Sequence, residues 1–160
     1  MTRPISLSKW LSLAALVILL DQWSKSAVVS HFIYGELMRV TGFFNLVLAH
    51  NEGAAFSMLA GAGGWQRWFF TAIAIGASVW IITMLRKHAA QTLFCFALTM
   101  ILGGALGNLI DRIAYGYVVD FLNFHWGEHH FPAFNLADSA ITLGAGLLLW
   151  DSFTQPKEKN

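Results

Sequence analysis

Two aspartates in apolar surroundings are the residues of this chain whose types and positions best suit chemistry. Asp120 lies in Y-V-V-D-F-L-N-F (residues 117–124), and Asp138 lies in F-P-A-F-N-L-A-D-S-A-I (residues 131–141). An ionised carboxylate costs free energy beside apolar segments that are long enough to span a membrane. Acids found there therefore indicate a functional site. Taken singly, each acid is explained as well by a helix cap or boundary position as by catalysis. Their closeness in the chain favours a catalytic pair.

Such a pair has a defined chemistry. Two carboxylates that share one site do not both ionise easily, so the pair holds one proton. The ionised acid can take a proton from a water molecule, and the protonated acid can give its proton to a leaving amine. The pair therefore predicts amide cleavage without a metal ion or a covalent intermediate.

Other polar residues in apolar segments are predicted to support structure. Asp21 and Lys25 are four residues apart on one helical face, where an ion pair that holds helices together is favoured over a direct chemical role. Asn108 and Arg112 share a face in the same way, and Arg112 is suited to hold a carboxylate or a lipid phosphate. Gly103, four residues before Gly107, allows a neighbouring helix to approach closely.

A short histidine motif offers a metal-dependent alternative. Residues 125–129, H-W-G-E-H, match an inverted zinc-protease pattern, which requires both histidines on one helical face and a further ligand elsewhere. Gly127 and Pro132 disfavour a helix here, and the only downstream glutamate is Glu158. An interfacial loop with aromatic anchors is therefore preferred, and no metal is expected. The chain has neither a G-x-S-x-G elbow nor a P-loop.

Composition places the chain among membrane proteins. Of 160 residues, 56% are hydrophobic and 12% are charged, and the mean hydropathy is +0.56. The net charge of +1 gives no reason to expect a nucleic-acid partner. The single cysteine, Cys95, excludes an intrachain disulfide framework. The first apolar run is followed by D-Q-W-S-K rather than by a small-residue cleavage site, so we read it as a retained helix.

Hydropathy predicts one integral membrane domain over residues 1–160, with four membrane helices. They are expected at residues 9–29, 68–85, 92–110 and 134–153, separated by extracytoplasmic segments at residues 30–67 and 111–133. Lysines and arginines in the short loops favour cytoplasmic termini. On this assignment the cytoplasmic side takes six of these residues, Arg3, Lys9, Arg86, Lys87, Lys157 and Lys159, and the outer side takes four, Lys25, Arg39, Arg67 and Arg112.

The first outer segment is predicted to contain a β-hairpin. Residues 38–40 and 43–48 are β-prone and flank Thr41-Gly42, a plausible turn. A small sheet with an apolar face can lie on the lipid surface, where Trp65 and Trp68 are suited to the interface.

Five blocks of residues occur in order along the chain: D-Q-W-S-K at 21–25, N-E-G-A-A-F at 51–56, G-G-A-L-G-N-L-I-D-R at 103–112, V-V-D-F at 118–121 and F-N-L-A-D at 134–138. Together they resemble the signature motifs of bacterial lipoprotein signal peptidase (signal peptidase II). The resemblance runs from the first predicted helix to the last, and five ordered blocks are far more specific than any one of them.

The resemblance implies an intramembrane aspartic endopeptidase of the bacterial inner membrane, with a substrate already carrying diacylglycerol on a cysteine. The enzyme would cut just before that cysteine and release the signal peptide. The catalytic acids would be Asp120 and Asp138, near the extracytoplasmic face. Residues implied to line or support the site are Asn51, Gly53, Asn108, Arg112, Asn135, Ala137 and, in a mainly structural part, Asp21.

The implied fold is an all-α polytopic membrane protein with four transmembrane helices, a small extracytoplasmic β-cradle within residues 30–64 and a short outer helix. We expect a monomer that meets prolipoproteins and membrane lipids and needs no cofactor. Two other classes of function are weighed against this one. A small transporter could use the paired acids as a proton relay, and a noncatalytic assembly subunit could use Gly103 and Gly107 for helix contacts.

Overall fold

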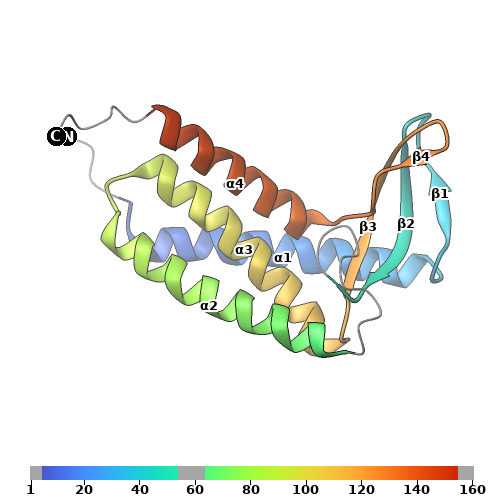
Figure 1. Cartoon of the computed structure of the whole chain (residues 1–160), viewed down its shortest axis with the longest axis horizontal. Coiled ribbons are helices and arrows are strands. Elements are labelled where there is room, and N and C mark those ends of the chain that lie inside the picture. The colour runs from blue at the N-terminus through green and yellow to red at the C-terminus, as the bar shows by residue number, and fades with distance from the viewer. Residues whose placement is uncertain (1–4, 54–63, 155–160) are drawn as a thin grey trace.

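Four long helices form a bundle, and a small antiparallel sheet lies across one end of it (Figure 1). This computed structural model describes residues 5–53 and 64–154. The helices are α1 (Leu7–His31), α2 (Trp65–Lys87), α3 (Thr92–Ala114) and α4 (Leu136–Thr154). The strands are β1 (Leu37–Arg39), β2 (Phe44–Asn51), β3 (Val118–Trp126) and β4 (His129–His130).

Three of the helices, α1, α2 and α3, are long and apolar enough to cross a membrane, judged by length and composition over the described residues. The fourth, α4, has 19 residues and is not in that set, so its crossing of the membrane stays a prediction. The start of α1 and the end of α4 lie together at the end of the bundle remote from the sheet (Figure 1).

One predicted boundary is wrong in a way that affects the site. We expected the third helix to end at residue 110, with Asp111 and Arg112 in the outer segment, but α3 continues to Ala114. Asp111 is 1% exposed and has an ion-pair partner on α1, so the helix gains a buried contact by continuing. Asn108 and Arg112 are therefore both on α3, one helical turn apart, which confirms the predicted shared face.

Helix α3 is the central element of the bundle because glycines let its neighbours approach closely. A Cβ atom built on Gly103 would lie 2.7 Å from the Cβ of Val17, and one on Gly107 would lie 2.6 Å from Asp21 Oδ2. Both contacts are with α1, which confirms the predicted close-approach face. Gly104 meets the carbonyl oxygen of Ala137 on α4 in the same way.

The sheet has the order β1-β2-β3-β4, and all its pairings are antiparallel. The predicted hairpin is confirmed by β1 and β2, with Leu37 opposite Val47. The expectation that this hairpin region alone supplies the sheet is wrong, because the second outer segment contributes β3. The β3 sequence was hard to recognise because its first residues are buried on both faces, which removes the alternation of apolar and polar residues.

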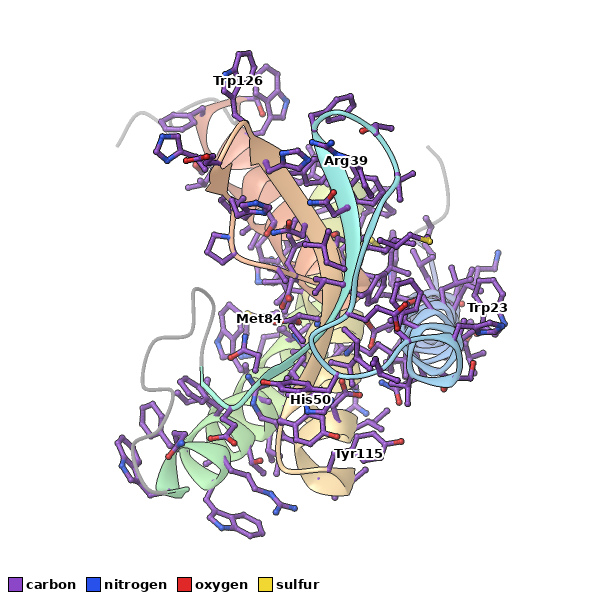
Figure 2. The ribbon with its side chains drawn as sticks, turned by 90° about the vertical axis from the view of Figure 1, so that its right-hand side faces the viewer. Trp23, Arg39, His50, Met84, Tyr115 and Trp126 are labelled. Carbon is purple, nitrogen blue, oxygen red and sulfur yellow. The ribbon has the colours of Figure 1, made fainter. Side chains whose placement is uncertain are left out.

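The interfacial loop predicted for residues 125–130 is also wrong. His125 pairs with His130, and Trp126 pairs with His129, so the segment is the tip of a β-hairpin. Figure 2 shows Trp126 at this tip, away from His50 and Tyr115. Between residues 32 and 53, and between 115 and 135, there is no short outer helix; residues 54–63 lie outside the described part of the chain.

Candidate active site

The two aspartates come from different elements and are joined by one asparagine. Asp120 is on β3, and Asp138 is in the first turn of α4. Asn135 Nδ2 donates to Asp120 Oδ1 at 2.7 Å, while the backbone N–H of Asn135 lies 3.3 Å from Asp138 Oδ2. The structure thus brings the predicted pair together around Asn135.

Local helix-capping explains why Asp138 is where it is. Asn135 Oδ1 accepts the N–H of Asp138 at 2.9 Å, and the Asp138 carboxylate accepts the N–H of Asn135 in return. This reciprocal arrangement is a capping box, which satisfies backbone donors that the first turn of a helix leaves unpaired. The sequence N-L-A-D therefore both starts α4 and orients Asp138.

A β-bulge brings Asn51 to Asp120. Leu46 pairs with Leu122, but two residues of β2 then oppose one residue of β3, so that Ala49 pairs with Asp120 and Asn51 with Val118. Without the extra residue, Asn51 would point to the other face of the sheet. As it is, Asn51 Nδ2 donates to Asp120 Oδ2 at 3.0 Å.

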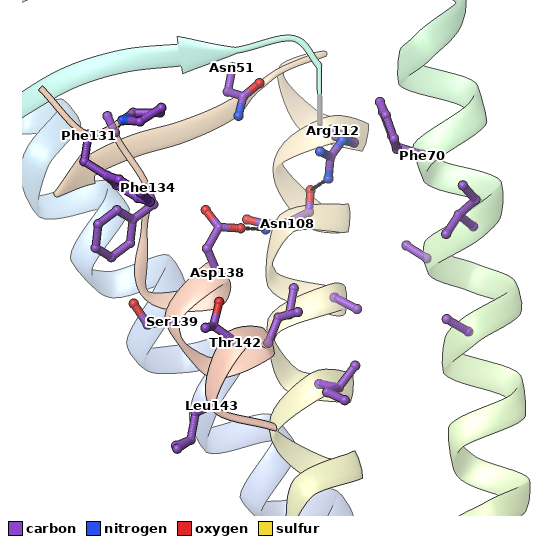
Figure 3. Close-up of a pocket in the computed structure, with 18 residues that line it drawn as sticks. Asn51, Phe70, Asn108, Arg112, Phe131, Phe134, Asp138, Ser139, Thr142 and Leu143 are labelled. Atoms are coloured by element: carbon purple, nitrogen blue, oxygen red, sulfur yellow. Dashed lines mark hydrogen bonds between the residues drawn. The ribbon is translucent and has the colours of Figure 1, made fainter. Parts of the chain in front are cut away.

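Asn108 performs the same task for Asp138. Its Nδ2 donates to Asp138 Oδ1 at 2.8 Å, a contact drawn in Figure 3. Its Oδ1 accepts two donors, Asn135 Nδ2 at 3.1 Å and Lys25 Nζ at 3.0 Å. Because both donors hold that oxygen, the amide nitrogen has to face Asp138. Each aspartate is therefore held by amide groups on both of its oxygens.

Burial makes the Asp120 carboxyl group a weaker acid than an exposed aspartate. Asp120 is only 2% exposed, and its burial, together with the nearby charge of Asp138, raises its pKa to about 7. The amide donors of Asn51 and Asn135 and the charge of Lys25 act in the opposite direction. A carboxyl group with such a pKa can hold or release a proton near neutral pH.

An open cavity of about 790 Å³ lies between α2, α3 and α4 and reaches Asp138. Its polar end is formed by Asn51, Asn108, Arg112 and Asp138, and the rest is mainly apolar (Figure 3). The guanidinium of Arg112 donates to the carbonyl oxygen of Gly53 at 3.0 Å and lies 5.3 Å from the ring centre of Phe70. Among the described residues it makes no salt bridge to a carboxylate.

Gly53 and Ala137, two further predicted site residues, act through their backbones. The N–H of Gly53 donates to Asn51 Oδ1 at 3.0 Å, so Gly53 is tied to both Asn51 and Arg112. Ala137 is fully buried, and its N–H donates to Asp21 Oδ1 at 2.9 Å. Asp21 thus contacts the residue next to Asp138.

Sequence reasoning found the ion pair between Asp21 and Lys25, which is present at 2.8 Å, but missed its third member. Lys25 Nζ also lies 2.9 Å from Asp111 Oδ2. The available signal was the charge of Asp111 at the end of an otherwise apolar helix, the same signal that singled out Asp120 and Asp138.

The histidine hairpin is separate from this site. Asp120 is near the start of β3 and His125 near its end, which places them roughly 16 Å apart along an extended strand. The side chains of His125 and His130 contact Gly127, Asn123 and each other. Over residues 5–53 and 64–154, no three histidine, cysteine or acidic side chains lie close enough to hold a metal ion.

Solved structures and curated relatives resemble the chain over nearly its whole length. Two structures of bacterial membrane enzymes, determined by the in meso method, superpose with TM-scores of 0.86 and 0.83 at 30% and 29% identity. The alignment with the first structure covers 100% of this chain and 98% of the matched chain. The alignment with the second covers 98% of this chain and 99% of the matched chain.

The sequence relatives are closer. The lipoprotein signal peptidase of Ralstonia nicotianae is 60% identical over 142 residues, which cover 89% of this chain and 82% of the relative. That of Cupriavidus taiwanensis is 56% identical over 149 residues, covering 93% and 85%. The family profile described as signal peptidase (SPase) II matches residues 13–154.

Fold and sequence together define a membrane-embedded protease. The chain belongs to the signal peptidase II family. This agrees with the resemblance seen in its five motif blocks.

Proposed function

We propose that this protein is an intramembrane aspartic endopeptidase that removes the signal peptide from diacylglyceryl-modified prolipoproteins. It cuts just before the lipidated cysteine. The observation that carries the proposal is the convergence of Asp120 and Asp138 on Asn135, with Asp138 at the polar end of a mainly apolar cavity. The names of the relatives, lipoprotein signal peptidases, supply the substrate class.

The proposed mechanism uses one shared proton. Asp120, with its pKa of about 7, holds the proton before reaction, and Asp138 is ionised. Asp138 takes a proton from a water molecule as the water oxygen bonds to the scissile carbonyl carbon, while Asp120 donates to the carbonyl oxygen. The carbon–nitrogen bond then breaks, the leaving amine takes up a proton from the pair, and the new carboxyl group stays with the signal peptide.

The amide side chains around the acids give this mechanism its geometry. Asn108, Asn51 and Asn135 fix the carboxylates from three different elements, so neither acid needs to reorganise when charge moves between them. Arg112 and Gly53 lie beside the polar end of the cavity, where they are suited to bind the substrate backbone or the lipid headgroup.

We further propose that residues 1–160 form one domain of the bacterial inner membrane and act as a monomer. In this arrangement α4 is the fourth crossing, both termini are cytoplasmic and the sheet is extracytoplasmic. The start of α1 and the end of α4 lie at the same end of the bundle, which supports this arrangement (Figure 1). Exposed Trp65 and Trp68 at the start of α2 suit an interface at the sheet end. The substrate's acyl chains would stay in the bilayer, which sets the depth of the scissile bond.

The test is a gel-shift assay with purified protein in detergent. Its substrate is a diacylglyceryl-modified prolipoprotein, compared with the unlipidated form. Asp120→Asn and Asp138→Asn should each lower turnover by about 10³-fold or more, because either change removes one partner in proton transfer. Asp151→Asn, at the other end of α4, is the matched control and should cleave normally.

Cleavage of the lipidated form alone, lost in both variants, would support the substrate class and the paired acids together. Substantial turnover by either purified variant would refute the catalytic pair. If the folded wild-type protein cleaves nothing, the endopeptidase proposal fails, and proton-coupled flux in liposomes becomes the next measurement.

A further inference from the structure

A buried cluster of charged side chains lies next to the elements that carry Asp120 and Asp138. It consists of Asp21 and Lys25 on α1 and Asp111 on α3, which are 0%, 3% and 1% exposed. Lys25 Nζ lies 2.8 Å from Asp21 and 2.9 Å from Asp111. Gln22 completes the cluster, with its Nε2 donating to Asp111 Oδ1 at 2.8 Å. Lys25 is thus the cation that both buried carboxylates share.

Two of the contacts that leave this cluster go to the residues that precede Asp120 and Asp138. Asp21 Oδ1 accepts the N–H of Ala137, the residue before Asp138. Asp111 Oδ2 accepts the N–H of Val119 at 3.0 Å, the residue before Asp120. One side of the cluster therefore holds the start of α4, and the other holds β3.

Lys25 has a second route to Asp138. Its ammonium donates to Asn108 Oδ1, and Asn108 Nδ2 donates to Asp138 Oδ1. The Lys25 ammonium thereby fixes the orientation of the Asn108 side-chain amide, with Oδ1 toward Lys25 and Nδ2 toward Asp138. Gly107 makes this possible, because a Cβ atom there would lie 2.6 Å from Asp21 Oδ2 and displace the carboxylate.

We propose that Lys25 is a positioning residue for the reaction: by joining Asp21 to Asp111 and holding Asn108, it sets the distance and orientation between Asp120 and Asp138. This inference rests on the proposed function for its kinetic consequence, but its structural consequence is independent of it. An ion pair that only held helices together would not require contacts with the backbone amides next to Asp120 and Asp138. Here Asp21 accepts the N–H of Ala137, and Asp111 accepts the N–H of Val119.

The test uses the full chain in detergent and three variants. Lys25→Met removes the cation. Asp21→Asn/Lys25→Met/Asp111→Asn also removes the two carboxylates, so that no uncompensated charge is left buried, and its amide oxygens can still accept the two backbone amides. Lys9→Met makes the same change at an exposed position of the same helix and is the matched control.

Two quantities are measured. The first is cleavage of the lipidated substrate, resolved into kcat and KM. Because a misplacement near 1 Å costs about 100-fold in rate, we expect kcat to fall by that order in Lys25→Met and at least tenfold in the triple variant, with KM changed less than about twofold. The second is amide hydrogen exchange, which needs no substrate.

Hydrogen exchange separates positioning from general stability. The amides of Val119 and Ala137 should exchange about tenfold faster in Lys25→Met, because their acceptors are no longer held together. The buried amides of Leu98 and Leu102 on α3 should be unchanged. Lys9→Met should resemble the wild type in every measurement.

The outcomes are decisive in both directions. Wild-type kcat in the triple variant, a rise in KM alone, or loss of folding in that variant would each overturn the inference. An equal increase in exchange at Leu98, Val119 and Ala137 would show a stabilising role and overturn it as well. If the wild type cleaves no lipidated substrate, the proposed function fails, while local exchange at Val119 and Ala137 still decides the role of Lys25.

Discussion

Removing the amide of Asn51 should extend proteolysis to higher pH. Asn51 Nδ2 donates to Asp120 Oδ2 at 3.0 Å, and this bond stabilises the ionised form of Asp120. Asn51→Ala removes it, so the protonated form becomes relatively more stable and the pKa of Asp120 rises. If Asp120 carries the catalytic proton, that proton is then retained further into the alkaline range.

The size of the shift follows from the structure. A hydrogen bond to a charged group contributes about 1.5–3 kcal/mol, and one pKa unit corresponds to about 1.4 kcal/mol. Asn135 still donates to Asp120, and water can replace part of the lost bond because Asn51 is only half-buried. We therefore expect a rise of about 1 unit. The alkaline limit of activity should move from about 7 to about 8.

The assay is kcat/KM for the lipidated substrate between about pH 5.5 and 9, which reports the pKa values of the free enzyme. The alkaline limb belongs to the pair of acids as a unit. Asn45→Ala is the matched control, since Asn45 is on the same strand but donates to Asn123 at 3.2 Å. The maximum rate of Asn51→Ala is expected to fall as well, because Asp120 loses one of its two orienting donors.

An alkaline limb that stays in place, or that moves to lower pH, would refute the reasoning. The first result would mean that Asp120 does not carry the proton that limits the reaction. The second would mean that Asn51 stabilises the protonated carboxyl group. An equal shift in Asn45→Ala would show that the limb reports a property of the sheet rather than the local hydrogen bond.

Three further predictions concern packing, metal dependence and the joining asparagine. Gly107→Ala should destabilise the protein by about 2 kcal/mol, because the added Cβ would clash with Asp21. Gly146 has open space around it, so Gly146→Ala should leave the melting temperature unchanged or raise it. Equal melting temperatures for the two variants would contradict the close approach of α1 and α3. EDTA should leave the cleavage rate unchanged, and a loss that zinc restores would instead support a metal-dependent mechanism. Asn135→Asp should lower kcat by about 100-fold, because the donor to Asp120 is replaced by a third acid. The melting temperature should fall as well, because the new carboxyl group is buried and the hydrogen bonds donated by Asn135 Nδ2 are lost. Near-normal turnover would argue against the joining role.

Several elements were accessible from local patterns in the sequence. Long apolar runs indicated the four helices, the spacing of Asp21 and Lys25 indicated their ion pair, and the residues around Thr41-Gly42 indicated the first hairpin. Each of these depends on neighbours within a few residues, so periodicity and spacing report it directly. Ordered motif blocks likewise indicated the family, which the comparisons show.

By itself, then, the sequence determined which segments are helical and which acids stand in apolar surroundings. Only the tertiary structure decided what surrounds those acids. The pairing of β2 with β3, the bulge that turns Asn51 toward Asp120, and the ion pair from Lys25 to Asp111 all join residues that are far apart in the chain. Periodicity says which face of an element is buried, but not which other face it meets, because that choice depends on the packing of all the elements at once.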